Sequence, residues 1–108
     1  MKAHSVIDQL EVDPLDPDQV VSGEPETSEL TLLETDTDGT SGLWQLTPGV
    51  VTDTEVEESF LVLSGRGEVT FEDGSRILLE PGVTHRFSGG EQTTWTVEET
   101  LLKAYWIA

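Results

Sequence analysis

The chain has no cysteine, almost no lysine and no long apolar stretch. Without cysteine it can form neither disulfides nor thiolate metal sites, and it has no cysteine nucleophile. A membrane-spanning helix needs about 18 or more apolar residues, so no membrane segment is expected. No apolar segment of the secretory type follows Met1. We therefore expect a cytoplasmic protein.

Basic residues are also scarce. Five lysines and arginines face 22 acids, which gives a formal net charge of −17. Such a surface repels phosphate backbones and anionic lipid, so neither nucleic acid nor a membrane is expected as a partner. The acidity fits either an acidic proteome or adaptation to high salt, and the sequence leaves both open.

The first part of the chain differs from the rest. The run from Asp13 to Asp18 contains Pro14 and Pro17, whose missing backbone donors exclude a helix interior or a central strand. We expect residues 11–28 to be irregular and solvated, and Ser5–Leu10 to form an edge strand. At 108 residues the chain fits one domain. We divide it into an acidic N-terminal arm over 1–28 and a barrel over 29–108.

From residue 30 onward, short β-type runs alternate with turn residues. The expected strands are Leu30–Glu34, Leu43–Thr47, Val50–Thr54, Phe60–Leu63, Glu68–Phe71, Arg76–Leu79, Thr84–Phe87, Thr93–Glu98 and Leu101–Ile107. Gly65-Arg66-Gly67 is read as a break between strands. Asp73-Gly74 predicts a two-residue hairpin of type I′. Many short strands at this spacing, with no convincing helix, indicate an all-β sandwich or barrel.

Two motifs resemble those of the cupin superfamily. In segment 58–74, Glu58 is followed after six residues by Gly65, as in the first cupin motif. Pro81-Gly82, with Gly89-Gly90 beyond it, resembles the second motif. With the flanking segments 42–49 and 94–105, the chain resembles small single-domain cupins related to ureidoglycine aminohydrolase and the ethanolamine-utilisation cupins. The resemblance covers residues 42–106 and implies a double-stranded β-helix, or jelly-roll barrel.

The resemblance also shows what is missing. Metal-dependent cupins carry two histidines shortly before the motif glutamate and a third after the second-motif glycine. Here residues 51–54 are Val-Thr-Asp-Thr, and the third position is Thr93. A catalytic metal site needs about three protein ligands, and only Glu58 of that set remains. We expect no bound metal and no other cofactor, although Asp53, Glu55, Glu57 and His85 would be the candidates for a makeshift site.

Glu58 is the first candidate for chemistry. Side chains two residues apart share a face of a strand, so Glu58 would lie beside Phe60 and Val62. If that face lines the barrel, an apolar environment suits the carboxyl group to acid–base work. The alternative is a carboxylate at the rim, tied to a threonine or a lysine.

Further candidates follow from the same alternation. Thr93 and Trp95 share a face that the resemblance directs into the cavity, and Trp44 adds a second aromatic wall unless the tryptophans only fill the core. His85 is a proton shuttle or a partly buried histidine satisfied by a carbonyl. Arg76 and Arg86 either clamp a substrate carboxylate or balance nearby acids. The expected ligand-binding set is Trp44, Thr52, Thr54, Phe60, Thr93, Trp95 and Lys103, with Glu58 and His85 as catalytic candidates and Lys103 pairing with Glu58 or Glu98.

Three functions remain open. The first is a cupin that binds a small polar organic molecule in its barrel, without the usual metal. The second is an aminohydrolase, isomerase or lyase with Glu58 as the acid–base residue. The third is an interaction module that docks a partner through the acidic arm or an exposed strand edge. A homodimer is expected, because symmetric dimers are the commonest assemblies.

Overall fold

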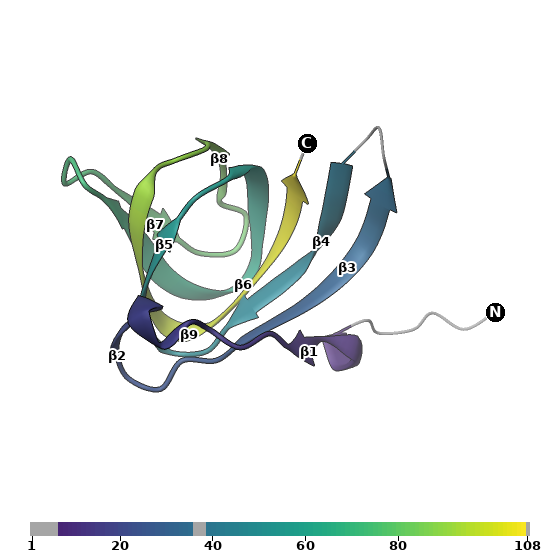
Figure 1. Ribbon diagram of the computed structural model, residues 1–108, viewed down its shortest axis with the longest axis horizontal. Helices are drawn as coiled ribbons and strands as arrows, with labels where there is room; N and C mark the ends of the chain where they lie inside the picture. The colour runs from purple at the N-terminus through teal and green to yellow at the C-terminus, as the bar shows by residue number, and fades with distance from the viewer. Residues whose placement is uncertain (1–6, 36–38, 108) are drawn as a thin grey trace.

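The computed structural model describes residues 7–35 and 39–107, and these form an all-β protein (Figure 1). The elements in chain order are two 3₁₀ turns, η1 (Ile7–Gln9) and η2 (Pro17–Gln19), and the strands β1 (Glu11–Val12), β2 (Val20–Ser22), β3 (Thr27–Thr35), β4 (Gly39–Leu46), β5 (Gly49–Thr54), β6 (Glu57–Phe71), β7 (Arg76–Leu79), β8 (Thr84–Ser88) and β9 (Gln92–Ile107). Every strand pairing is antiparallel. The all-β jelly-roll prediction is confirmed. None of the helical turns in the described ranges is long enough to cross a bilayer.

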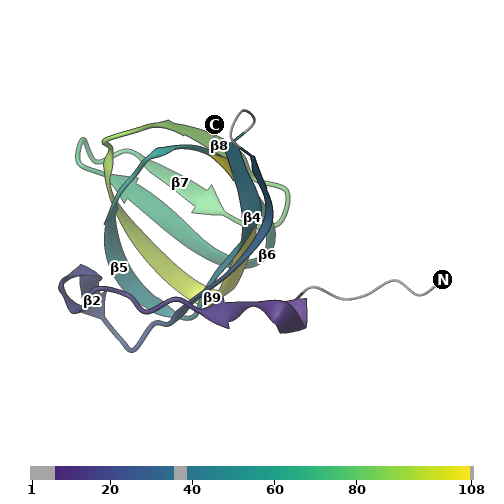
Figure 2. The same cartoon turned by 45° about the vertical axis from the view of Figure 1, so that its right-hand side comes forward.

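Two long strands, β6 and β9, run antiparallel to each other and are shared by both walls of the barrel. The second half of β9 pairs with β4 and with the first half of β6, which also pairs with β8. The first half of β9 pairs with β5 and with the second half of β6, which also pairs with β7. β3 extends the first wall and β2 the second. Figure 2 looks into the resulting barrel, with the segment that carries β2 along its lower edge.

The predicted break at Gly65-Arg66-Gly67 is wrong, because β6 continues through it. The pairing with β9 shifts register between Val62 and Gly67, so the strand bends from one wall into the other without ending. Gly65 has φ +97°, and a Cβ there would lie 2.2 Å from the carbonyl oxygen of Thr100. β9 likewise runs unbroken through Glu98–Leu101, where two separate strands were expected.

The hairpin at Asp73-Gly74 also differs from the prediction. A type I′ turn needs positive φ at both central residues, and among the described residues only glycines have positive φ. Gly74 has φ +87°, while the amide of Gly74 donates to the Phe71 carbonyl and that of Phe71 to the Ser75 carbonyl. The Asp73 carboxylate accepts from both the amide and the hydroxyl of Ser75. This local bonding favours a longer loop with glycine in the left-handed position.

The N-terminal segment is more ordered than expected. Residues 7–9 form a 3₁₀ turn, so the edge strand predicted over Ser5–Leu10 is wrong for these residues, and Ser5 and Val6 lie outside the described residues. Asp16 caps η2 by accepting from the amide of Asp18, and Pro17 occupies the first turn. β1 and β2 then add to the edges of β3 and β5. The division at residue 28 stays a prediction.

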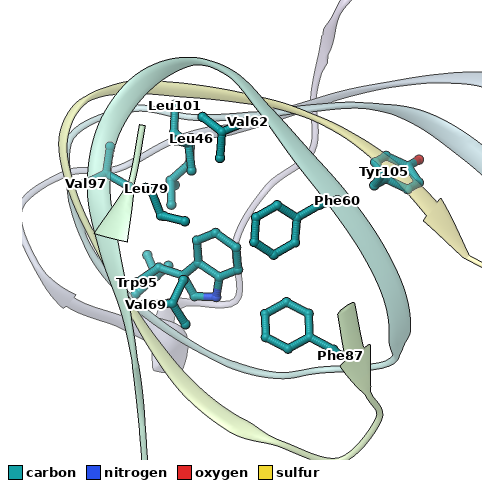
Figure 3. Packing of buried hydrophobic residues seen from close by; sticks show 11 residues of the cluster. Leu46, Phe60, Val62, Val69, Leu79, Phe87, Trp95, Val97, Leu101 and Tyr105 are labelled. Carbon is teal, nitrogen blue, oxygen red and sulfur yellow. The ribbon is translucent and has the colours of Figure 1, made fainter. Parts of the chain in front are cut away.

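The core lies between the two walls, where strand alternation sends one side chain in two inward. Figure 3 shows Phe60, Phe87 and Trp95 gathered inside the barrel, with Tyr105 farther along β9. The buried cluster is Leu46, Val51, Phe60, Val62, Val69, Leu79, Phe87, Trp95, Val97, Leu101 and Tyr105. Burying such side chains contributes about 1.5–3 kcal/mol each. The core does not fill the barrel completely, and space remains beside Trp95 and Tyr105.

Candidate functional site

That space is a cavity of about 260 Å³ enclosed by β3, β4, β5, β6 and β9. Leu15 and Gln19 of the N-terminal segment border it, and the exposed residues Asp53, Thr54 and Val56 mark where it meets solvent. The complete lining is Leu15, Gln19, Glu29, Trp44, Val51, Thr52, Asp53, Thr54, Glu55, Val56, Glu58, Trp95, Lys103, Tyr105 and Ile107. It mixes aromatic walls with convergent polar groups, as ligand cavities do.

A buried ion pair joins the two long strands. The Lys103 ammonium donates to Oε2 of Glu58 at 2.9 Å, and the two side chains are only 6% and 11% exposed. Strand alternation explains both positions: Glu58 shares the inward face of β6 with Phe60 and Val62, and Lys103 shares that of β9 with Leu101 and Tyr105. A lysine with so little access to water needs a partner of opposite charge.

Three aromatic rings complete the surroundings of the Lys103 ammonium. Its Nζ lies 4.6 Å from the ring centroid of Trp44, 4.8 Å from that of Trp95 and 5.1 Å from that of Phe60. The two tryptophan rings meet edge to face at 5.5 Å. Cation–π attraction is strongest where water is excluded. The ammonium is therefore fixed by Glu58 on one side and by rings on the others.

A second polar cluster centres on Glu55. Its Oε2 accepts a hydrogen bond from the Thr93 hydroxyl at 2.7 Å and another from the Trp95 indole at 3.1 Å, and the residue is 7% exposed. Burial and the nearby Asp53 carboxylate raise the pKa of Glu55, while its hydrogen bonds and the Lys103 charge lower it, and the net value is about 7. Burial also raises the pKa of Asp53. Asp53 and Glu55 therefore do not ionise independently, and the pair retains a proton more readily than two separate carboxyl groups would.

This cluster makes stability depend on pH. Because the folded-state pKa of Glu55 is above its unfolded value of 4.5, its contribution is complete below pH 4.5 and is lost as the pH rises through about 7. Between pH 4.5 and about 7, we expect the free energy of unfolding of Glu55→Gln to fall less than that of the parent. The difference between the two decreases is of the order of 3 kcal/mol. Urea unfolding at a series of pH values measures it. Parallel curves for parent and variant would contradict the raised pKa.

A third pair lies at the far wall. The Tyr105 hydroxyl donates to Oε1 of Glu29 across β4, which separates their strands. Burial raises the pKa of Tyr105, and the Glu29 carboxylate raises it further. Tyr105 thus stays a neutral donor at physiological pH and holds Glu29 at the cavity wall.

The structure brings most of the predicted ligand-binding residues to this cavity. Trp44, Trp95 and Lys103 line it, as does the catalytic candidate Glu58. Thr52 and Thr54 border it, but their hydroxyls bond to the Gln19 carbonyl and the Gln92 side chain. The interior side of β5 belongs instead to Val51 and Asp53.

Other predicted residues lie outside the lining. Phe60 is fully buried in the core, and Thr93 is buried on the same face of β9 as Trp95, where it donates a hydrogen bond to Glu55. His85 packs against the rings of Phe60, Phe71 and Phe87, 5.1–6.2 Å away, and is not part of the cavity surface.

The charged residues pair in only some of the predicted ways. Of the two partners considered for Lys103, the structure selects Glu58, while Glu98 lies 4.0 Å from Arg66. Arg76 pairs with Glu68 and Arg86 with Glu57, and neither arginine lines the cavity. Their placement agrees with balancing of nearby acids.

The residues present do not fit the metal that many cupins hold. The positions equivalent to the missing histidines carry threonine, valine or aspartate, and the one retained ligand, Glu58, is occupied by the Lys103 ammonium. A metal cation beside Glu58 would be repelled by that ammonium. Across residues 7–35 and 39–107, no three of His, Cys, Asp and Glu are grouped to hold a metal ion.

Sequence reasoning named Glu55 only as a candidate for a makeshift metal site and did not place it in the ligand cavity. Glu55 and Val56 form the turn between β5 and β6, beyond the last residue of β5. The turn is fixed by backbone bonds from the Glu55 amide to the Glu91 carbonyl and from the Gly90 amide to the Glu55 carbonyl. One signal was available in the sequence. Val51, Asp53 and Glu55 are two residues apart, so they would share the inward face of β5 if its alternation continued into the turn.

The jelly-roll barrel with the retained motif glutamate inside it defines a cupin. The family model of the EutQ-like cupin domain matches residues 33–105, and the chain belongs to this family. No curated protein matches the chain.

Solved structures agree with this assignment. A DUF861-family protein of unknown function from Pseudomonas syringae pv. tomato is 25% identical with a TM-score of 0.79, over 89% of this chain and 43% of that one. A protein of unknown function from Rhizobium leguminosarum is 28% identical with a TM-score of 0.63, over 73% and 77%. The Clostridium difficile EutQ protein, at 13% identity, shares the fold with a TM-score of 0.65, over 75% and 61%. The chain thus spans less than two thirds of the Pseudomonas and Clostridium proteins.

Proposed function

We propose that the protein binds a small, positively charged organic molecule in the barrel cavity. The observation that carries this proposal is the charge of the lining, where four carboxyl groups (Glu29, Asp53, Glu55 and Glu58) converge with a single ammonium. Lys103 is already neutralised by Glu58, so it offers little to an anionic ligand. Asp53 and Glu55 remain for a cationic group, which would interact with them more strongly in a partly dehydrated cavity than in water.

The rest of the lining supports a compact ligand. A cavity of about 260 Å³ lies slightly below the usual range of ligand cavities. Trp44 and Trp95 supply an apolar wall, while Asp53 lies at the solvent side. A protonated amine on a short carbon chain fits this arrangement of an apolar wall and a carboxylate near the solvent. Its amine would lie near Asp53 and Glu55, and its carbon atoms would contact the indoles.

A screen of small amines, neutral polyols and small carboxylic acids, read by thermal shift and confirmed by calorimetry, tests this. Amines are expected to bind, and binding is expected to tighten as the pH rises through about 7 and Glu55 ionises. Asp53→Asn should weaken amine binding at least about tenfold, because it removes a charge-assisted contact. Asp73→Asn, in the exposed β6–β7 loop, is the matched control and should bind like the parent. Carboxylic acids binding better than amines would contradict the proposal.

A second candidate is an enzyme with Glu55, rather than Glu58, as the acid–base group. The observation in its favour is the pKa of about 7, which allows Glu55 to give or take a proton near neutral pH. Proton NMR of the amines that bind, incubated with the protein, would detect turnover. Product formed by the parent but not by Glu55→Gln would support this candidate, and ligands left unchanged by the parent would contradict it.

A further inference from the structure

Residues 13–19 cross the lower edge of the barrel, and we call this segment the strap (Figure 2). The strap connects β1, which pairs with the edge of β3, to β2, which pairs with β5. Since β3 extends one wall of the barrel and β5 belongs to the other, the strap bridges the two walls. It closes part of the cavity, because Leu15 and Gln19 belong to the cavity lining.

The strap is held at both ends. At its start, the Asp13 amide donates to the Thr27 carbonyl, and the Thr27 hydroxyl donates to the Asp13 carbonyl. At its end, the Gln19 side-chain amide donates to the Thr52 carbonyl at 3.1 Å, and the Thr52 hydroxyl donates to the Gln19 carbonyl at 3.4 Å. One anchor lies on β3 and the other on β5. Contacts within the chain therefore define where the strap lies over the cavity.

Between these anchors, one apolar side chain of the strap turns inward. The other residues over 13–18 are exposed, whereas Leu15 is half-buried and packs against the core. Pro14 and Pro17 restrict the backbone on both sides of it, which limits how far the Leu15 side chain can move away from the cavity. An acidic segment that only needed to be solvated would not place a leucine there.

A second hollow lies against Leu15. It is an open groove of about 480 Å³, and its lining includes Val12, Pro14, Val20 and Pro25. Among the described residues, Leu15 alone lines both the cavity and this groove. Its side chain is therefore the partition between the two spaces. Shortening it would join them and lengthen the cavity without changing any other residue of the lining.

We propose that Leu15 is a specificity-determining residue of the cavity and limits the bound amine to a short carbon chain. The inference rests on the proposed function, because it concerns the ligand whose amine lies near Asp53 and Glu55. A carbon chain that extends along Trp44 and Trp95 gains about fourfold in affinity, or about 0.8 kcal/mol, for each methylene that it buries. The gain ends where the chain meets Leu15. A longer amine must displace this side chain or leave carbon atoms in water.

Calorimetric titration with linear primary amines from ethylamine to octylamine tests this. The affinity of the parent is expected to rise with chain length, to pass through a maximum and then to fall. Leu15→Ala should move the maximum to longer amines, and the amine at the new maximum should bind this variant at least about tenfold more tightly than the parent. Leu15→Phe should move the maximum to shorter amines. Val21→Ala, at an exposed position of β2 outside the cavity lining, is the matched control and should leave the maximum in place.

A measurement without ligand tests Leu15 separately. The Trp95 indole donates to Glu55 and Thr93 at the cavity wall. Leu15→Ala should speed the exchange of this indole proton with solvent at least about tenfold relative to the backbone amides of β6 and β9, because water then enters from the strap side. Circular dichroism checks that each variant is folded. If no amine binds the parent, the proposed function fails. If amines bind but the parent, Leu15→Ala and Leu15→Phe prefer the same chain length, or if the indole exchange is unchanged, the role of Leu15 alone is overturned.

Discussion

Replacing Lys103 with methionine is expected to lower the free energy of unfolding by about 3–5 kcal/mol, because it leaves the Glu58 carboxylate buried without its partner. Both side chains are nearly inaccessible, and the ammonium also contacts three aromatic rings. The loss is large compared with a typical total stability of about 5–15 kcal/mol. Urea unfolding followed by tryptophan fluorescence measures it.

The double variant Lys103→Met with Glu58→Leu is the control. With both charges removed, no uncompensated charge is left in the barrel, and well-packed apolar replacements of a buried pair are often neutral or stabilising. Most of the lost stability should return. If the single and double variants are equally unstable, lost packing and not the unpaired carboxylate is the cause.

Replacing Gly65 with alanine is the second large expected effect, a loss of about 2–5 kcal/mol. The residue has φ +97°, which costs an L-amino acid about 1–2 kcal/mol. Its new Cβ would also lie 2.2 Å from the Thr100 carbonyl oxygen and 2.6 Å from the Leu101 Cα. Both are backbone atoms of β9, so relief requires moving the strand, at a further cost of about 1–3 kcal/mol. Thermal and urea unfolding measure the loss.

Gly74 provides the matched control, since it has a similar φ of +87° but no neighbouring atom within 4 Å of the place a Cβ would take. Gly74→Ala should therefore show only the conformational cost of about 1–2 kcal/mol. Equal losses at both positions would show that the close approach of β6 and β9 does not contribute.

The fold was predictable wherever alternation and motif residues agreed. Glu58, Phe60 and Val62 lie on one face of β6, as their spacing indicates, and the motif glutamate marks the barrel interior. The two long strands were not predicted as single elements. Gly65 and Gly67 interrupt the apolar pattern as a loop would, and only the pairing with β9 shows that they bend a continuous strand.

The site was predictable in part, for a related reason. Lys103 and Trp95 follow the period of β9, whereas Glu55 lies in a turn positioned by Gly90 and Glu91, far away in sequence. The retained Glu58 drew attention as the acid–base candidate, but its electrostatic environment depends on Lys103, 45 residues away. The sequence narrowed the partner of Lys103 to Glu58 or Glu98, and only the three-dimensional structure selects Glu58.

The three tryptophans give a direct test of the cavity proposal, because they report on separate regions. Trp44 and Trp95 line the cavity, and the Trp95 indole donates to Glu55, while Trp106 is half-exposed and lies outside the cavity. In a nitrogen–proton NMR titration with an amine that binds, the indole signals of Trp95 and Trp44 are expected to shift together and to saturate, with Trp106 unaffected. Saturable binding that leaves the Trp44 and Trp95 signals in place, or that moves Trp106 alone, would contradict a binding site inside the barrel.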